Sequence, residues 1–350
     1  MSRWLSPLMA FCLSFMLMTT FAPLTGLAGH QLDFWGLWLV TVCVLALPIA
    51  YLEFALVKRA KTSILNALMS LTREADASSR WRLVGWLSVI FMPFLAGSVL
   101  ANAQHTLGQF FNLPMSETIG FVVLACVAFV LSFLPRHFLV LLSILGTGAS
   151  LVLCHVFNLT LPQWSITPIT FQEWGNATVL ALVASGLGLG IYAQSNQTTE
   201  QATSAVIPVW VAQILAVIVF GFFAVQAVIP AFTVLLTGIF IAALLLQLAL
   251  QQLKDRHVTV ILQYVLLFVP LLVWAVSALV PVLNTFTMLW GLVICLIYAI
   301  FAGWMMKISH LRKALNFTHE ASYNIWRIAV RLVLPISIVL AMIAVVLGMF

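Results

Sequence analysis

The chain alternates long apolar stretches with short polar segments from one end to the other. Each apolar stretch has about 18 residues or more, the length at which a helix crosses the ~30 Å hydrocarbon core of a bilayer. These stretches are apolar on every face, whereas the strands of a membrane β-barrel alternate polar and apolar positions. The pattern predicts an all-α integral membrane protein with about eleven transmembrane helices. We place them near residues 4–28, 35–57, 82–108, 118–135, 137–159, 177–195, 205–229, 231–252, 258–281, 284–306 and 324–349.

Charged residues are rare and occupy few of the polar segments. Only 7% of the residues are charged and 63% are hydrophobic, whereas a soluble domain has about 25% charged residues. If the N-terminus lies in the cytoplasm, all fifteen Lys and Arg residues fall on the cytoplasmic side, as the positive-inside rule requires. We therefore expect a protein in contact with the lipid bilayer, with its N-terminus in the cytoplasm and its C-terminus outside.

The same distribution argues against several classes of soluble protein. The net charge of +6 does not indicate nucleic-acid binding, because the basic residues are not gathered on a soluble face. The longest cytoplasmic segments, 58–82 and 307–323, are too short for a soluble catalytic domain. The sequence also lacks HExxH, CxxC and paired-Asp motifs within the spans. We expect no enzyme, no catalytic residue, no bound metal and no cofactor.

Two of the predicted helices contain residues that interrupt helices. These residues are Thr19, Thr20, Ala22 and Pro23 in the first helix and Ser185, Gly186, Gly188 and Gly190 in the sixth. Three glycines at alternate positions favour local unwinding or a very close helix contact. Interrupted helices in matching places of two repeats are typical of a transporter's substrate site. The alternative is that 185–190 is a small-residue packing face and that Pro23 only ends or kinks the first helix.

Short motifs along the chain resemble the neurotransmitter:sodium symporter family. They are the run from Leu47 to Leu56 around Glu53, Leu83–Trp86 with Pro93, Leu187–Gly190, Gln213–Val217 with Gly221, Ile300–Trp304, and Trp326 to Arg331 with Pro335. The motifs span the chain in the family's order, although each is short.

The resemblance implies a single transmembrane domain, residues 1–350, with the LeuT-type fold. Two inverted five-helix repeats would cover about 4–159 and 177–306, and an extra helix about 324–349, as in bacterial members with eleven spans. It implies a bacterial inner-membrane location and secondary transport of a small molecule, an amino acid or amine, driven by Na+. The interrupted helices would bind the substrate, and Glu53 and Gln213 become coupling or gating candidates.

The sequence departs from the family at its polar sites. Counted along the family's motifs, Met18 and Phe21 replace an Asn and an Arg of the first helix. The stretch 239–243 offers no side-chain oxygen to a second sodium site, and residues 83–108 contain no Tyr. We therefore doubt ordinary two-sodium coupling. The open alternatives are a less polar substrate, coupling to protons or to nothing, and a transport-inactive scaffold or sensor derived from this fold.

An ionisable side chain at membrane depth is costly and so becomes a functional candidate. Glu53 lies within about a turn of Lys58 and Arg59 near the inner end of the second helix. We expect a structural ion pair or an interfacial position for Glu53 rather than a proton carrier.

Overall fold

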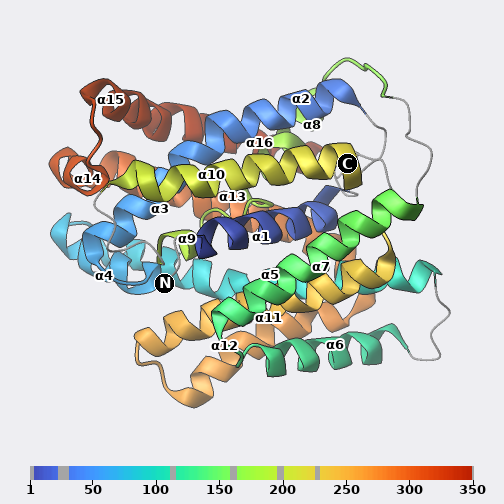
Figure 1. The fold of residues 1–350 in the computed structure, drawn as a ribbon. Helices are drawn as coiled ribbons and strands as arrows, with labels where there is room; N and C mark the ends of the chain where they lie inside the picture. Colours follow the sequence, from blue (N-terminus) through green and yellow to red (C-terminus); the bar gives the residue numbers. More distant parts are fainter. Residues whose placement is uncertain are drawn as a thin grey trace.

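The computed structural model describes residues 4–22, 31–110, 116–157, 164–194, 201–224 and 229–348, all in helices and short connections. Seven continuous helical segments are long and apolar enough to cross a membrane, and three shorter apolar helices accompany them, counted over these residues. The long helices lie side by side with their axes roughly aligned (Figure 1). The helix that begins the chain starts at one end of the bundle, and the last helix ends at the other (Figure 1).

The helices of the first half correspond closely to the predicted spans. They are α1 Leu5–Phe21, α2 Leu32–Thr41 continued by η3 Val42–Ala46 and α3 Leu47–Ala60, α4 Ile64–Glu74, η4 Ser79–Arg82, α5 Leu83–Phe110, α6 Glu117–Leu131 and α7 Arg136–Phe157. The second half follows the same pattern. Its elements are α8 Phe171–Leu182, α9 Ile191–Gln194, α10 Ala202–Val219 with η5 Phe220–Ala224, α11 Ala231–Asp255, α12 Val260–Leu272 with η6 Val273–Ala275 and η7 Ser277–Leu279, α13 Val280–Ile300 with η8 Phe301–Met305, α14 Ile308–Leu315, and α15 Glu320–Ile328 with η9 Ala329–Val333 and α16 Leu334–Leu347.

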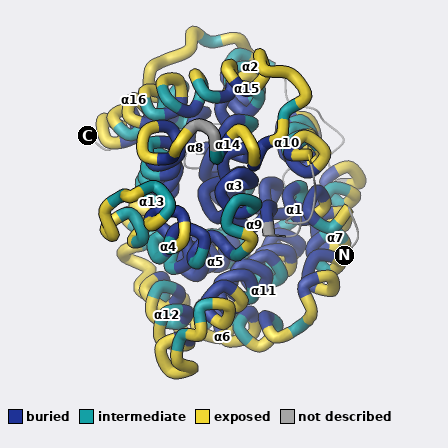
Figure 2. The backbone as a smooth tube through the Cα atoms, turned by 90° about the vertical axis from the view of Figure 1, so that its left-hand side faces the viewer, coloured by how far each residue is buried: buried dark blue, intermediate teal, exposed yellow. Residues whose placement is uncertain are grey.

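Burial separates central helices from peripheral ones. Helices α1, α3 and α5 lie at the centre and are mostly buried, whereas α6, α7, α12 and α16 have exposed outer faces (Figure 2). Those outer faces are apolar: Ile261 on α12 is 80% exposed and Val130 on α6 is 66% exposed. A continuous apolar exterior of this kind is unfavourable in water and favourable in lipid. The protein is therefore an integral membrane protein.

Within the described residues, four stretches of π-helix interrupt or end the α-helical hydrogen bonding of long helices: η3, η5, η8 and η9. Two of them precede a proline by two residues, Pro48 after η3 and Pro335 after η9, and proline leaves a helical carbonyl without its usual donor. Indole N–H groups from two other helices donate to carbonyls near the first of these prolines. Trp210 Nε1 donates to the Val42 carbonyl at 3.3 Å and Trp326 Nε1 to the Pro48 carbonyl at 3.1 Å. These bonds satisfy backbone groups that lipid could not.

Helices α4 and α14 were not predicted, and both lie at the same end of the bundle (Figure 1). Each is too short to span a membrane, and α4 buries one face through Ile64, Ala67, Leu68 and Leu71. That spacing is the i, i+3, i+4, i+7 pattern of an amphipathic helix, which was available in the sequence. Both helices contribute basic residues to this end.

Candidate functional site

Residues 183–190 connect α8 to α9 without regular helical structure in the middle of the bundle. Gly186, Gly188 and Gly190 have φ values of +66°, +88° and +66°. Side chains other than glycine rarely adopt this backbone conformation. Of the two readings of this motif, the structure therefore shows local unwinding, and the three glycines are required where they stand.

Glu53 on α3 holds this unwound segment. It is 2% exposed, and its Oε1 accepts a hydrogen bond from the backbone N–H of Gly188. The N–H groups of Leu189 and Gly190 also point to the same carboxylate. Three backbone donors that a helix would have used internally are therefore directed at one side chain, in the manner of an anion nest.

Apolar side chains close around the unwound segment. A Cβ on Gly186 would lie 2.3 Å from Leu13 Cδ2, and a Cβ on Gly188 would lie 3.0 Å from Cys295 Sγ. A Cβ on Gly190 would lie 2.8 Å from the Cβ of Ile64. The glycines thus allow α1, α13 and α4 to pack directly against the backbone of the segment.

Polar groups gather around the carbonyl of Ser185. The Tyr192 hydroxyl donates to this carbonyl at 2.9 Å, and Gln213 Nε2 donates to it at 3.1 Å. Ser185 Oγ and Gln213 Oε1 are buried with no hydrogen-bond partner in the described part of the chain. Ser14 of α1 is fully buried and lies beside the Tyr192 hydroxyl. Buried polar atoms without partners usually mark a site for water or a ligand.

The two predicted threonines of the first helix bond within their own helix instead of joining this group. Thr19 Oγ1 and Thr20 Oγ1 both donate to the carbonyl of Met16, at 2.7 and 3.0 Å. Helix α1 is unbroken from Leu5 to Phe21, and Ala22 still donates its N–H to Met18. Pro23 lies outside the described residues. The expected interruption is therefore absent from residues 5–21, and Ser14 and Leu13, which the sequence analysis did not select, are the α1 residues at the site.

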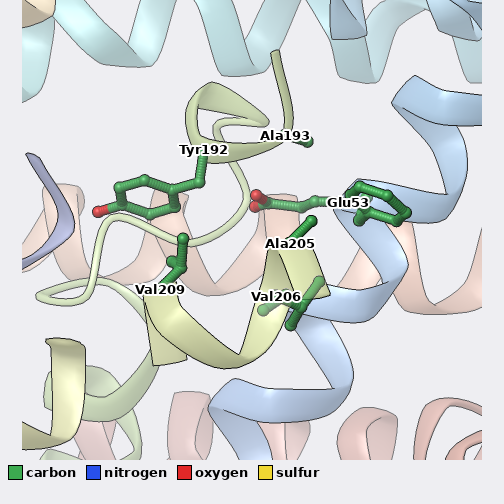
Figure 3. A pocket seen from close by; sticks show the side chains of 8 residues that line it. Glu53, Tyr192, Ala193, Ala205, Val206 and Val209 are labelled. Atoms are coloured by element: carbon green, nitrogen blue, oxygen red, sulfur yellow. The ribbon is translucent and has the colours of Figure 1, made fainter. Parts of the chain in front are cut away.

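A pocket of about 260 Å³ (open solvent included) lies beside Glu53. Its wall is formed by α3, α9 and α10, and the Glu53 carboxylate extends across it toward the segment that carries Tyr192 and Ala193 (Figure 3). Ala205, Val206 and Val209 of α10 form its apolar side. The lining therefore combines one carboxylate and one phenol with small apolar groups.

The predicted ion pair of Glu53 does not form. The ammonium group of Lys58 lies 5.4 Å from the centre of the Phe54 ring, and Arg59 pairs with Glu74 of α4 instead. His310 Nδ1 of α14 approaches the same Glu74 carboxylate at 3.3 Å. The prediction was wrong because helical spacing places Glu53 on the face that packs inward, while Lys58 and Arg59 reach the end of the bundle.

A second polar cluster joins α5 to α13. Asn102 Nδ2 donates to Asn284 Oδ1 at 2.9 Å, and Asn284 Nδ2 donates to Asn102 Oδ1 at 3.1 Å. Ser98 Oγ donates to the same Asn284 oxygen at 3.1 Å. This reciprocal amide pair connects two spanning helices and leaves little polar capacity unused, so it is a structural link rather than a binding site.

The all-helical arrangement, with spanning helices packed around the unwound segment 183–190, is the LeuT-type fold. The crystal structure of MhsT in complex with L-phenylalanine has this arrangement, with a TM-score of 0.72, 15% sequence identity and coverage of 98% of each chain. No family model and no curated protein matches the sequence. At this identity the similarity shows the fold alone.

Proposed function

We propose that the protein is a secondary active transporter for a small, largely apolar substrate such as an amino acid or an amine. The observation that carries this proposal is the unwound segment 183–190, held by Glu53 at the centre of a LeuT-type fold. In this fold an unwound helix at mid-membrane is where a transporter binds its substrate. Ser185, Gly186, Gly188 and Gly190 would form the substrate site, with Ser14 and Leu13 on the facing side.

The contacts of the segment support a gating role for Glu53 and Gln213. Both side chains hold the segment through hydrogen bonds to its backbone rather than through helical bonding. Glu53 accepts from the N–H groups of 188–190, and Gln213 donates to the Ser185 carbonyl. Such bonds can exchange without unfolding either α8 or α10. A substrate amine or hydroxyl that reached Ser185 Oγ or Gln213 Oε1 would satisfy groups that now have no partner.

We propose that transport by this protein does not depend on Na+. The family resemblance implies Na+, but the carbonyls of Leu5–Met18 are engaged within the regular α1 helix. A helical carbonyl that already accepts its internal bond is a poor cation ligand, and Na+ prefers several oxygen ligands together. Glu53 is the one buried carboxylate in the described ranges. Because a carboxylate takes up and releases protons, a proton gradient is the alternative source of energy for transport.

A transport-inactive scaffold or sensor is the second candidate. The observation in its favour is that Leu13 packs against Gly186, where an unwound first helix would leave room for substrate. If this contact is permanent, the central site stays filled by the protein's own side chains. A stoichiometric protein partner that co-purifies, together with no uptake, would favour this function.

We propose that the end of the bundle with α4, α14 and α15 faces the cytoplasm of a bacterial inner membrane, because the Lys and Arg residues are on that side of the predicted topology. From the LeuT-type fold we also propose two inverted repeats, about 4–159 and 177–306.

Labelling of single cysteines introduced at Arg80 and Glu117 by a membrane-impermeant maleimide tests the orientation. Glu117 should react in intact cells and Arg80 only after lysis.

The transport test uses the full chain in liposomes, with radiolabelled L-phenylalanine, L-leucine and tryptamine as probes. Uptake is measured under an imposed proton gradient, an imposed Na+ gradient, both, or neither. We expect uptake of at least one probe above empty liposomes, without a requirement for Na+. Absence of uptake and of counterflow for every probe would contradict transport, whereas uptake that requires Na+ would contradict only the coupling proposal.

A further inference from the structure

A second pocket, of about 230 Å³ (open solvent included), lies between η8 at the end of α13 and the α15–η9 helix. Its lining includes residues of α14 and α15, and these two helices lie at one end of the bundle (Figure 1). Tyr323, Trp326, Arg327 and Arg331 line it together with Gly303 and neighbouring apolar residues. It shares no residue with the pocket beside Glu53, so the proposed transport function does not account for it.

The pocket has a positive charge that no acid balances. The ion pairs of the described residues are Arg59 and His310 with Glu74, and Arg312 with Glu320. Neither Arg327 nor Arg331 has a carboxylate partner in this set. Arg327, Arg331 and Arg312 all lie within electrostatic reach of Tyr323. Two guanidinium groups one helical turn apart repel each other unless an anion lies between them.

The guanidinium of Arg331 is held in place by the protein. Its Nε donates to the Gly303 carbonyl, which η8 leaves without a regular α-helical donor, and its guanidinium lies 5.6 Å from the centre of the Trp304 ring. Among the described residues, the terminal nitrogens of Arg331 have no hydrogen-bond or ion-pair partner. An Arg fixed in this way offers a planar pair of donors that suits a phosphate group.

Apolar groups continue outward from the rim of the pocket. Trp304, Met305, Ile328 and Leu332 are exposed on the adjoining turns of η8, α15 and η9. These side chains face the surroundings of the bundle, where lipid acyl chains lie in a membrane protein. A soluble anion would use the charged pocket and leave this apolar surface uncovered. A lipid with an anionic headgroup would use both at once.

We infer that this pocket binds the phosphate-bearing headgroup of an anionic phospholipid, with its acyl chains along Trp304 and Leu332. Arg327 and Arg331 bind the phosphate oxygens, and Tyr323 contributes a hydroxyl near the same place. Basic pockets between transmembrane helices on the cytoplasmic side commonly bind such headgroups. The site would fix α15 and η9 against the end of α13.

The test uses the purified, delipidated full chain and measures its melting temperature and its bound lipid by native mass spectrometry. The probes are cardiolipin, phosphatidylglycerol, phosphatidylcholine and inorganic phosphate. We expect the two anionic lipids to raise the melting temperature and to remain bound, and phosphatidylcholine and phosphate to do neither. Arg327→Ala should weaken the apparent affinity for cardiolipin about fivefold, since a Lys or Arg near an anionic surface contributes about 1 kcal/mol.

Two variants serve as controls. Arg80→Ala removes an exposed charge from η4 at the same end of the bundle and should leave the lipid response unchanged, which separates the pocket from general surface charge. Arg327→Lys keeps the charge and should retain most of the affinity. An equal loss for Arg80→Ala, an unchanged affinity for Arg327→Ala, or a response to inorganic phosphate alone would each overturn the assignment.

Discussion

The carboxylate of Glu53 accepts a hydrogen bond from the backbone N–H of Gly188, a residue 135 positions later in the chain. This bond connects α3, the inner part of one spanning helix, to the unwound segment between α8 and α9. Both groups are buried, so neither can exchange its partner for bulk water.

Glu53→Leu should lower the thermal stability of the protein strongly. The substitution removes the acceptor and leaves buried N–H groups unpaired, at a cost of about 1–3 kcal/mol for each group. Glu53→Gln retains one acceptor oxygen and should lose less. Melting temperature in detergent is the measurement, and Glu117→Gln, an exposed carboxylate on α6, is the matched control. Equal melting temperatures for Glu53→Leu and wild type would show that these bonds do not stabilise the fold.

Gly188→Ala should also destabilise the protein. The φ of +88° at this position is unfavourable for alanine, and the new Cβ would contact Cys295 Sγ at 3.0 Å. Backbone strain of this kind costs about 1–3 kcal/mol. Gly148→Ala is the control, because no neighbouring atom lies within 4 Å of the new Cβ in α7. It should be neutral or slightly stabilising, and similar losses for both variants would contradict the role assigned to the unwound segment.

The Asn102–Asn284 pair should show a coupling energy in a double-mutant cycle. Asn284→Ala removes both reciprocal amide bonds and leaves the Asn102 amide with its bond to Ser98. Polar pairs between transmembrane helices contribute about 0.6 to 2 kcal/mol. The free energies of unfolding of Asn102→Ala, Asn284→Ala and the double variant give the coupling. Thr285→Ala is the control, because this half-buried side chain bonds only to the Pro281 carbonyl of its own helix. Additive single effects would contradict a direct link.

Stability should depend on pH through Glu74. The hydrogen bond from Arg59 lowers the pKa of this carboxyl below its ordinary value of 4.5. A carboxyl with a lower pKa in the folded state stabilises the fold above the unfolded-state pKa, and this contribution disappears as pH falls through the folded-state pKa. The difference in melting temperature between wild type and Glu74→Gln should therefore be largest above pH 4.5 and shrink in more acidic buffer. The contribution is about 0.2–1 kcal/mol for a partly exposed pair. A difference that grew with acidification would contradict this pairing.

The sequence by itself determined the membrane class of this protein and the approximate positions of its spanning helices, and it left unwinding at 185–190 as one of two alternatives. Span length and apolarity are local properties of the chain, because the bilayer sets both. Three alternating glycines are a local signal for unwinding, because glycine permits backbone angles that other residues disfavour. In the structure each of them adopts such an angle. The amphipathic spacing of α4 carried a similar local signal.

Tertiary structure alone decided the partners. From the sequence we expected Glu53 to pair with Lys58 or Arg59. In the structure the rotation of α3 directs the Glu53 carboxylate to the backbone N–H of Gly188. Helix packing likewise brings Asn284 to Asn102 and Trp326 to the Pro48 carbonyl, although these partners are 182 and 278 positions apart in the sequence. In lipid every buried polar group must find a partner within the protein, and the sequence does not say which helix will bring it.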